Sequence, residues 1–139
     1  MTGFVLDCSV AMSWCFEDEA SAYADLVLDA LKGTQAVVPS LWPLEVANVL
    51  SVAERRSCLS ASQLTRAITL LQALPIRVDT LTAQQALGAT LSLAREHSLS
   101  AYDAAYLEVA MREGLPLATA DVQLLKVIKA CGIPVYLQE

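Results

Sequence analysis

Histidine, basic residues and long apolar runs are scarce in this chain of 139 residues. His97 is the one histidine, which excludes a multi-histidine metal site and argues against a Ser-His-Asp triad. No run of about 18 apolar residues occurs, so we expect no membrane span. The start of the chain lacks a basic segment and soon reaches an acid, Asp7, so we expect no signal peptide.

The cysteines carry no metal or redox motif. None of the four belongs to a Cys-x-x-Cys pair, and a chain of this size buries about 68–70% of its unfolded surface without cross-links. We therefore expect reduced thiols and a cytoplasmic protein. The length also predicts a single domain over residues 1–139.

The chain is acidic, with 9 Lys and Arg residues against 15 Asp and Glu residues and a net charge of −6. Such a surface repels nucleic acid at long range and differs from that of a DNA-binding module. It is still compatible with a nuclease that contacts RNA through metal ions, because each Mg²⁺ cancels two carboxylate charges. The high hydrophobic content, 55%, predicts a buried partner surface, either a dimer contact or a groove for another chain.

Short apolar runs alternate with segments of helical periodicity. We expect strands at residues 3–6, 36–38, 76–79, 115–118 and 133–137, and helices at 10–16, 17–31, 41–56, 60–74, 82–94 (with Thr80 as the other possible start), 100–110 and 122–130. In this interpretation Ser40 caps the helix 41–56, Asp79 caps the helix 82–94, and Gly88 marks close packing. Alternating strands and helices predict an α/β fold with a parallel sheet covered on both faces.

Four acids stand where a parallel sheet collects its ligands. Asp7 and Asp121 follow expected strands, and Glu45 and Asp103 lie in the first turns of expected helices. The carboxyl ends of parallel strands and the helices that follow them meet at one sheet edge, so we expect these side chains to gather there. Each acid also has a structural interpretation. Asp7 suits a turn and Glu45 the edge of an apolar stripe; Asp103 suits a capping box with Ser100, and Asp121 suits an N-cap.

Carboxylates that share a cleft need a counter-charge. Two of them about 5 Å apart at an effective dielectric constant near 20 repel by about 3 kcal/mol. Because Lys and Arg are few, we expect a hard dication to hold the group together. Oxygen ligands alone favour Mg²⁺ or Mn²⁺.

Four blocks of the chain resemble, in the same order, those of PIN-domain ribonucleases: FVLDCS at 4–9, PLEVAN at 43–48, YDAAYL at 102–107 and LATAD at 117–121. The likeness is greatest to the VapC toxins of bacterial type II toxin–antitoxin modules, and it covers nearly the whole chain. It implies a PIN-like (Rossmann-like) three-layer α/β/α sandwich around a central parallel sheet of four or five strands.

The resemblance also implies a site and its partners. It assigns Mg²⁺ or Mn²⁺ binding and catalysis to four acids and a supporting role to hydroxyl and amide side chains: Asp7, Glu45, Asp103 and Asp121, supported by Ser9, Thr119 and Asn48. Proteins of this kind cleave RNA and are usually homodimers. They are held inactive by a cognate antitoxin that lays a helix and basic side chains against the toxin.

Two other functions stay open. A PIN-like domain that keeps the acids without catalysis would serve as a protein-interaction module. A phosphotransfer or hydrolase domain built on Asp7 would normally carry Asp-x-Asp after the first strand, whereas the chain has Asp7, Cys8 and Ser9 there. The residues therefore favour a Mg²⁺- or Mn²⁺-dependent ribonuclease that acts as a toxin.

Overall fold

The computed structural model describes residues 3–138, and its centre is a parallel four-stranded sheet in the order β3-β2-β1-β4. The strands are short: β1 (Phe4–Leu6), β2 (Ala36–Val38), β3 (Ile76–Val78) and β4 (Leu117–Ala118). β1 lies between β2 and β4, and its three side chains are fully buried. Apolar residues without alternation therefore form a strand that is covered on both faces.

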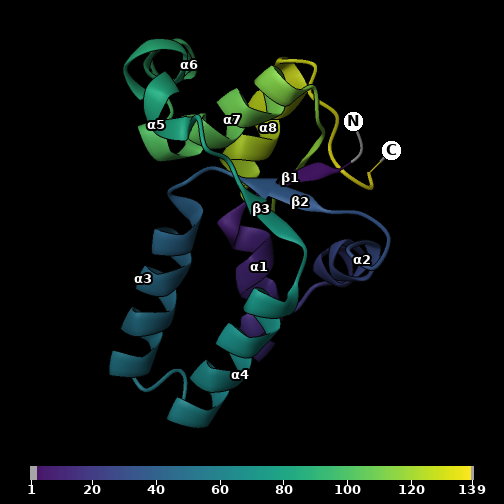
Figure 1. Ribbon diagram of the computed structural model, residues 1–139, viewed down its shortest axis with the longest axis vertical. Coiled ribbons are helices and arrows are strands. Elements are labelled where there is room, and N and C mark those ends of the chain that lie inside the picture. Colours follow the sequence, from purple (N-terminus) through teal and green to yellow (C-terminus); the bar gives the residue numbers. More distant parts are fainter. Residues whose placement is uncertain (1–2, 139) are drawn as a thin grey trace.

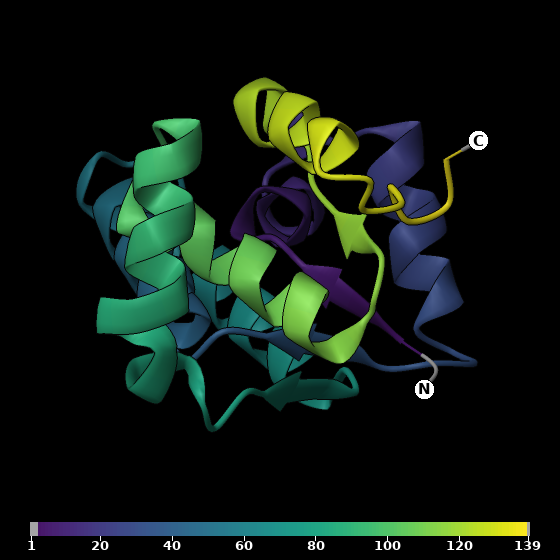
Figure 2. The ribbon, with the colours of Figure 1, turned by 90° about the horizontal axis from the view of Figure 1, so that it is seen from above.

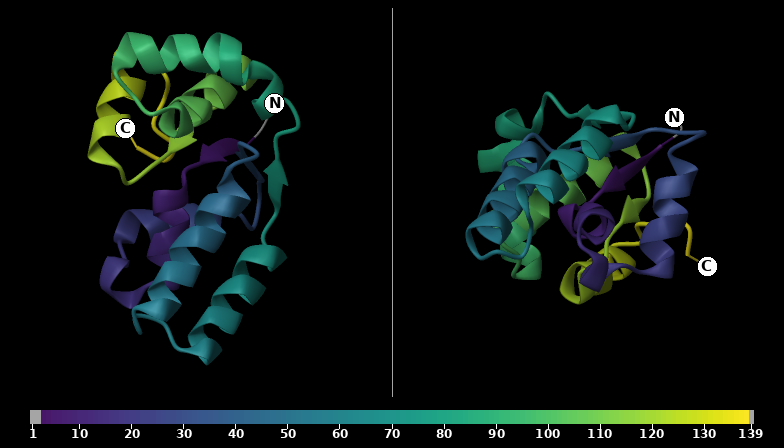
Figure 3. Two further views of the ribbon diagram at one scale, coloured as in Figure 1. Left: turned by 90° about the vertical axis from the view of Figure 1, so that its left-hand side faces the viewer. Right: turned by 90° about the horizontal axis from the view of Figure 1, so that it is seen from below.

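Helices cover the two faces of the sheet (Figure 1). On one side lie α1 (Cys8–Cys15), α2 (Ala22–Ala30), α3 (Trp42–Arg55) and α4 (Ala61–Ala73); on the other lie α5 (Thr82–Gln85), α6 (Leu91–His97), α7 (Ala101–Glu113) and α8 (Val122–Ala130). The pair α3 and α4 extends away from the sheet (Figure 3). This arrangement confirms the predicted three-layer α/β/α sandwich. No helix within residues 3–138 is long and apolar enough to cross a membrane.

The strand order creates a switch point between β1 and β4. The chain adds β2 and then β3 on one side of β1, and it returns to place β4 on the other side. Figure 2 shows β1 and β4 side by side, with α7 crossing over them. Chain segments that leave the two strands go to opposite faces and open a crevice at the strands' carboxyl ends. Asp7 follows β1 there, and Thr119 follows β4.

The predicted helix 17–31 is wrong in its first part. Residues Glu17–Glu19 form a separate 3₁₀ turn, η1, and α2 begins only at Ala22. The Ser21 hydroxyl accepts the Ala24 N–H at 3.0 Å, so it provides the cap that the acidic triplet lacks. The predicted cap of α3 is also wrong: Leu41 is the N-cap residue, and its side chain makes no capping hydrogen bond.

The expected helix 82–94 is interrupted. A π-helical segment, η2 (Ala86–Thr90), separates α5 from α6, and α6 runs on to His97 before Ser98 ends it in the left-handed region at φ 54°. Close packing at Gly88 is contradicted, because a Cβ placed on it meets nothing within 4 Å. A glycine in a helix therefore says little here about neighbouring elements.

The expected last strand is reduced to a single parallel bridge between Leu117 and Val135. Pro134 has no N–H for a ladder, which limits pairing along this segment. Two backbone hydrogen bonds hold the segment to Leu117, whose N–H donates to the Pro134 carbonyl and whose carbonyl accepts the Tyr136 N–H, each at 3.0 Å. Side-chain contacts add to them. The ring of Tyr136 stacks on Phe4 with centroids 4.0 Å apart, and the Tyr136 carbonyl accepts the Tyr23 hydroxyl at 2.7 Å.

Candidate metal centre

Asp7 lies at the centre of the candidate site. It is only 6% exposed and follows β1 directly as the N-cap residue of α1. Its Oδ2 accepts the hydroxyls of Ser9 at 2.6 Å and of Thr119 at 2.8 Å. Burial raises the pKa of the Asp7 carboxyl above its ordinary value, and the charge of Asp121 adds to this, while the two hydroxyls oppose it.

The same two hydroxyls join the chain segments that leave β1 and β4. Ser9 Oγ accepts the Ala120 N–H at 3.0 Å, and Thr119 Oγ1 accepts the Asp121 N–H at 3.0 Å. Each hydroxyl thus donates to the same carboxylate oxygen; Ser9 accepts from the segment after β4, and Thr119 accepts from within its own segment. Ser9 and Thr119 therefore fix the orientation of the Asp7 side chain across the switch point.

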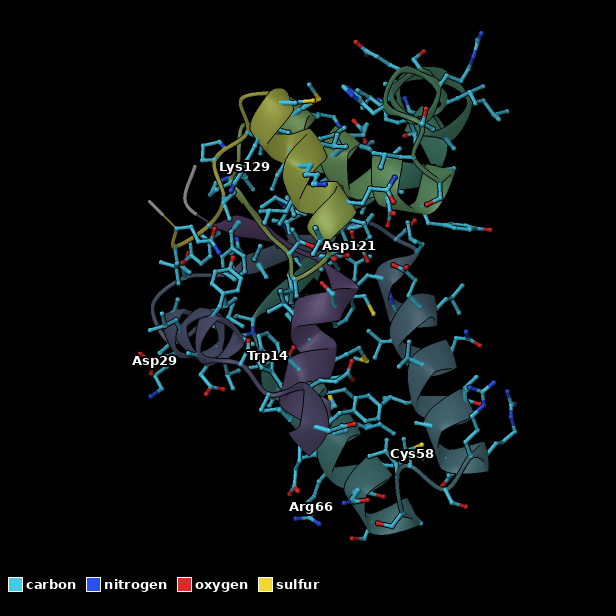
Figure 4. All side chains as sticks on the ribbon, turned by 180° about the vertical axis from the view of Figure 1, so that it is seen from behind. Trp14, Asp29, Cys58, Arg66, Asp121 and Lys129 are labelled. Atoms are coloured by element: carbon cyan, nitrogen blue, oxygen red, sulfur yellow. The ribbon has the colours of Figure 1, made fainter. Side chains whose placement is uncertain are left out.

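Asp121 is exposed at the start of α8, where its Oδ1 caps the helix by accepting the Leu124 N–H at 2.9 Å. Figure 4 shows Asp121 at the N-terminal end of α8, with Lys129 farther along the same helix. The predicted N-cap is thus confirmed, and it coexists with a position beside Asp7, whose pKa the Asp121 charge raises.

Glu45 is half-buried in the first turn of α3, and its Oε1 accepts the hydroxyl of Tyr106. Tyr106 belongs to α7 and is fully buried. Burial raises the pKa of the Glu45 carboxyl, as do the charges of Asp7 and Asp103, and the Tyr106 hydroxyl opposes the rise. Glu45 thus lies at the edge of the face that α3 buries, and α7 supplies a polar partner.

Asp103 is half-buried in the first turn of α7. The Ser100 hydroxyl caps this helix by accepting the Asp103 N–H at 3.0 Å, which confirms Ser100 as the predicted cap. The Asp103 side chain faces other acids. Burial raises its pKa, and the charges of Asp7 and Asp121 raise it further.

The four acids therefore share one electrostatic environment at the carboxyl edge of the sheet. Each lies at a helix N-terminus, where unpaired N–H groups and the helix dipole favour negative charge. Within residues 3–138 no Lys, Arg or His forms an ion pair with any of them. The site thus combines mutual repulsion with a lack of side-chain counter-charge.

The donor set fits a hard dication, because the four acids and the hydroxyls of Ser9 and Thr119 all offer oxygen. In the described part of the chain, however, no three His, Cys, Asp or Glu side chains already form a group that could hold a metal ion. Asp7 and Glu45 are fixed by hydroxyls, whereas Asp121 is exposed to solvent. Binding would therefore require side-chain movements toward a common ion.

Asn48 lies one turn after Glu45 on α3, but it is exposed and lines a neighbouring groove.

Tyr106 was not among the residues that the sequence predicted for the site. Its signal was the spacing of three residues from Asp103, which puts the two on adjoining positions of one helix.

The interpretation of Asp79 as a helix cap is wrong: Asp79 is 3% exposed and pairs with Arg112 at 2.8 Å.

Comparisons with known proteins agree with this geometry. The PIN domain family model matches residues 4–130. The chain belongs to the PIN domain family. Proteins with this domain are generally nucleases, and they typically use divalent metals. No curated protein matches the chain.

Two solved structures share the fold. PAE2754 from Pyrobaculum aerophilum is 23% identical with a TM-score of 0.66, and the match covers 90% of this chain and 78% of that one. A toxin–antitoxin complex from Klebsiella pneumoniae is 19% identical with a TM-score of 0.60, and the match covers 85% of this chain and 86% of that one. At these identities the likeness supports the PIN fold of the chain and does not extend to activity.

Proposed function

We propose that this PIN domain is a Mg²⁺- or Mn²⁺-dependent ribonuclease. One observation carries the proposal: burial and the charges of neighbouring acids raise the pKa values of Asp7, Glu45 and Asp103. Within residues 3–138 no cationic side chain is paired to these three acids or to Asp121. A dication relieves that repulsion and provides the charge that a phosphodiester needs.

The proposed ligands are the carboxylates of Asp7, Glu45 and Asp103, with Asp121 orienting the coordination shell or a second ion. A divalent metal, when bound here, supplies water activation and stabilisation of charge on phosphate. The protein's own contribution is orientation. Ser9 and Thr119 hold the Asp7 carboxylate, and the Tyr106 hydroxyl holds Glu45, so these two oxygen donors are directed before substrate arrives.

We further propose that the chain is the toxin of a VapC-type toxin–antitoxin pair, controlled by a cognate antitoxin. A groove of about 740 Å³ supports this, and its lining includes Asn48, one turn after Glu45 on α3. Its apolar floor includes Val49 and Val52, and the exposed acids of Glu17–Glu19 line one wall. An apolar helix with basic side chains is complementary to such a groove, and the basic groups would neutralise the acidic chain.

The remaining parts of the proposal concern assembly. We propose that residues 1–139 form one domain that acts as a cytoplasmic homodimer. Exposed Leu81, Leu87 and Leu91 on and beside α5 and α6 support an apolar contact between copies, with Leu87 89% exposed. Sedimentation of the purified chain at several concentrations tests the dimer, and a monomer at every concentration would contradict it.

The activity is tested by incubating end-labelled single-stranded RNA with the parent and with Glu45→Gln, in Mg²⁺ and in EDTA. The expected result is cleavage by the parent in Mg²⁺ alone and its loss in Glu45→Gln. Asp29→Asn is the matched control, because Asp29 is an exposed acid on α2 that pairs with Lys32. Equal cleavage by Glu45→Gln, or cleavage in EDTA, would contradict the proposal.

One observation favours a second function. Because no three acids of the described residues already form a metal-binding group, the domain could instead keep its acids for a basic partner protein. A Mg²⁺ titration of the thermal unfolding midpoint separates the two functions. A midpoint that rises with Mg²⁺ supports the nuclease, and one that is insensitive to Mg²⁺ supports the interaction module.

A further inference from the structure

A buried ionic cluster lies beside the acids of the site without belonging to them. We call it the Arg112 cluster, and it consists of Asp79, Thr82, Glu108 and Arg112. Arg112 donates two hydrogen bonds to Asp79, at 3.1 and 2.8 Å, and two to Glu108, at 2.8 and 3.0 Å. The two carboxylates are 3% and 4% exposed. One guanidinium thus fills two bidentate positions inside the protein.

Stability alone gives little reason for this cluster. A buried ion pair is often no more stabilising than apolar side chains of the same volume, since both charges lose their hydration. What the pair offers is a fixed geometry, because the planar guanidinium fork accepts carboxylates in few orientations. The role of the cluster therefore depends on which helices and strands its hydrogen bonds join.

The cluster reaches the beginning of α3 through Thr82. The Thr82 hydroxyl donates to Asp79 at 2.7 Å and accepts the Ser40 N–H at 3.0 Å. Ser40 lies between β2 and α3, just before the N-cap residue Leu41, which provides no side-chain cap. A hydrogen-bonded path therefore runs from Arg112 on α7 to the segment that leads into α3.

The same two helices are joined a second time inside the site. The hydroxyl of Tyr106, on α7, donates to Glu45 in the first turn of α3. The Arg112 cluster thus fixes the approach to α3, and Tyr106 fixes the carboxylate that this helix carries. Two separate attachments therefore join α7, which carries Asp103, to α3 and the segment before it, which position Glu45.

We propose that Asp79, Thr82, Glu108 and Arg112 are positioning residues that fix the first turn of α3, and with it Glu45, against α7. The consequence for metal affinity rests on the proposed function. A natural comparison is the Arg77–Glu113 ion pair at 2.8 Å, which also joins β3 to α7. Within residues 3–138 neither of its side chains forms a hydrogen bond with Ser40, whose N–H is bound by Thr82. A positioning role predicts that breaking the Arg112 cluster disturbs the first turn of α3, whereas breaking the Arg77–Glu113 pair leaves that turn unchanged.

The test compares Thr82→Val, which keeps the shape and removes the hydroxyl, with Thr82→Ser, which keeps the hydroxyl, and with the control Arg77→Gln. Amide hydrogen exchange of the metal-free protein is measured over residues 40–46, and Mn²⁺ affinity is measured from the electron paramagnetic resonance signal of free Mn²⁺. For Thr82→Val we expect about tenfold faster exchange there and about tenfold weaker Mn²⁺ binding. Thr82→Ser and Arg77→Gln should match the parent in both.

Each result decides one claim. Unchanged exchange over residues 40–46 in Thr82→Val overturns the positioning role, as does a lowered unfolding midpoint with unchanged exchange and Mn²⁺ affinity. Faster exchange in Thr82→Val, in a parent that binds no Mn²⁺, supports positioning and contradicts the proposed metal-dependent function. If Thr82→Val does not fold, as judged by circular dichroism, Thr82→Ala is compared in the same way.

Discussion

Replacing Asp7 with asparagine should make the metal-free protein more stable and remove its metal response. Both hydroxyl bonds end on Oδ2 of Asp7, so the carbonyl of an asparagine can accept them in the same place. The charge that burial and Asp121 oppose is then gone. The fold should therefore tolerate Asp7→Asn.

The size of the effect follows from simple electrostatics. Two carboxylates about 8 Å apart at an effective dielectric constant of 20 repel by about 2 kcal/mol. Solvent around the exposed Asp121 reduces this, so we expect a gain of about 1 kcal/mol, or about 3 °C in the unfolding midpoint of a domain of this size. Saturating Mg²⁺ instead raises the stability of the parent relative to Asp7→Asn. At a hundredfold excess over Kd it stabilises the parent by about 2.7 kcal/mol, or about 8 °C.

The two proteins should therefore exchange their order of stability. In EDTA, Asp7→Asn unfolds at a higher temperature than the parent; in Mg²⁺ the parent unfolds higher, and RNA cleavage by the variant falls on the order of 100-fold or more. Differential scanning fluorimetry in both buffers, with a cleavage assay on the same samples, measures this. An Asp7→Asn protein that is less stable in EDTA, or that gains as much from Mg²⁺ as the parent, would refute the reasoning.

Three further predictions follow from the same groups. The pKa values of Asp7, Glu45 and Asp103 are raised, so the folded chain retains protons that the unfolded chain has lost. In EDTA the unfolding midpoint should therefore fall as the pH rises above about 4. A midpoint that rises with pH would contradict this. Tyr106→Phe removes the hydroxyl from Glu45 but keeps the ring, so Mn²⁺ should bind about tenfold more weakly by calorimetry, and unchanged binding would exclude this role of Tyr106. Burial, with the charge of Glu45, raises the pKa of the Cys8 thiol to about 12, so iodoacetamide at neutral pH should alkylate exposed Cys58 and spare Cys8, as peptide mass spectrometry can measure; equal labelling in the folded protein would contradict this.

The positions of Asp7 and Asp121 could be predicted from the sequence because Asp7 directly follows one short apolar run and Asp121 lies three residues after another. The residue after a buried strand leaves the core at the strand's carboxyl end, and a parallel sheet brings these ends to one edge. The N-cap of α8 at Asp121 was predictable for the same local reason, since a cap depends on the three or four residues that follow it. Local patterns thus determine where these acids leave the core.

The partners of the acids could not be read from the same patterns. Glu45 and Tyr106 are 61 positions apart, and Asp79 and Arg112 are 33 apart. Their contacts therefore depend on how α7 packs against α3 and against the segment after β3. Apolar periodicity states which face of a helix is buried and does not state what lies opposite. Asp79 shows the consequence, since a cap and a buried ion pair have the same signature in the sequence.

The most direct test of the central claim is the anomalous scattering of Mn²⁺ in crystals of the parent chain. The account predicts one strong peak at the carboxyl ends of β1 and β4, with a carboxylate oxygen of Asp7 and one of Glu45 or Asp103 each about 2 Å from the ion. A peak bound elsewhere on the protein, while these side chains keep their metal-free positions, would contradict it.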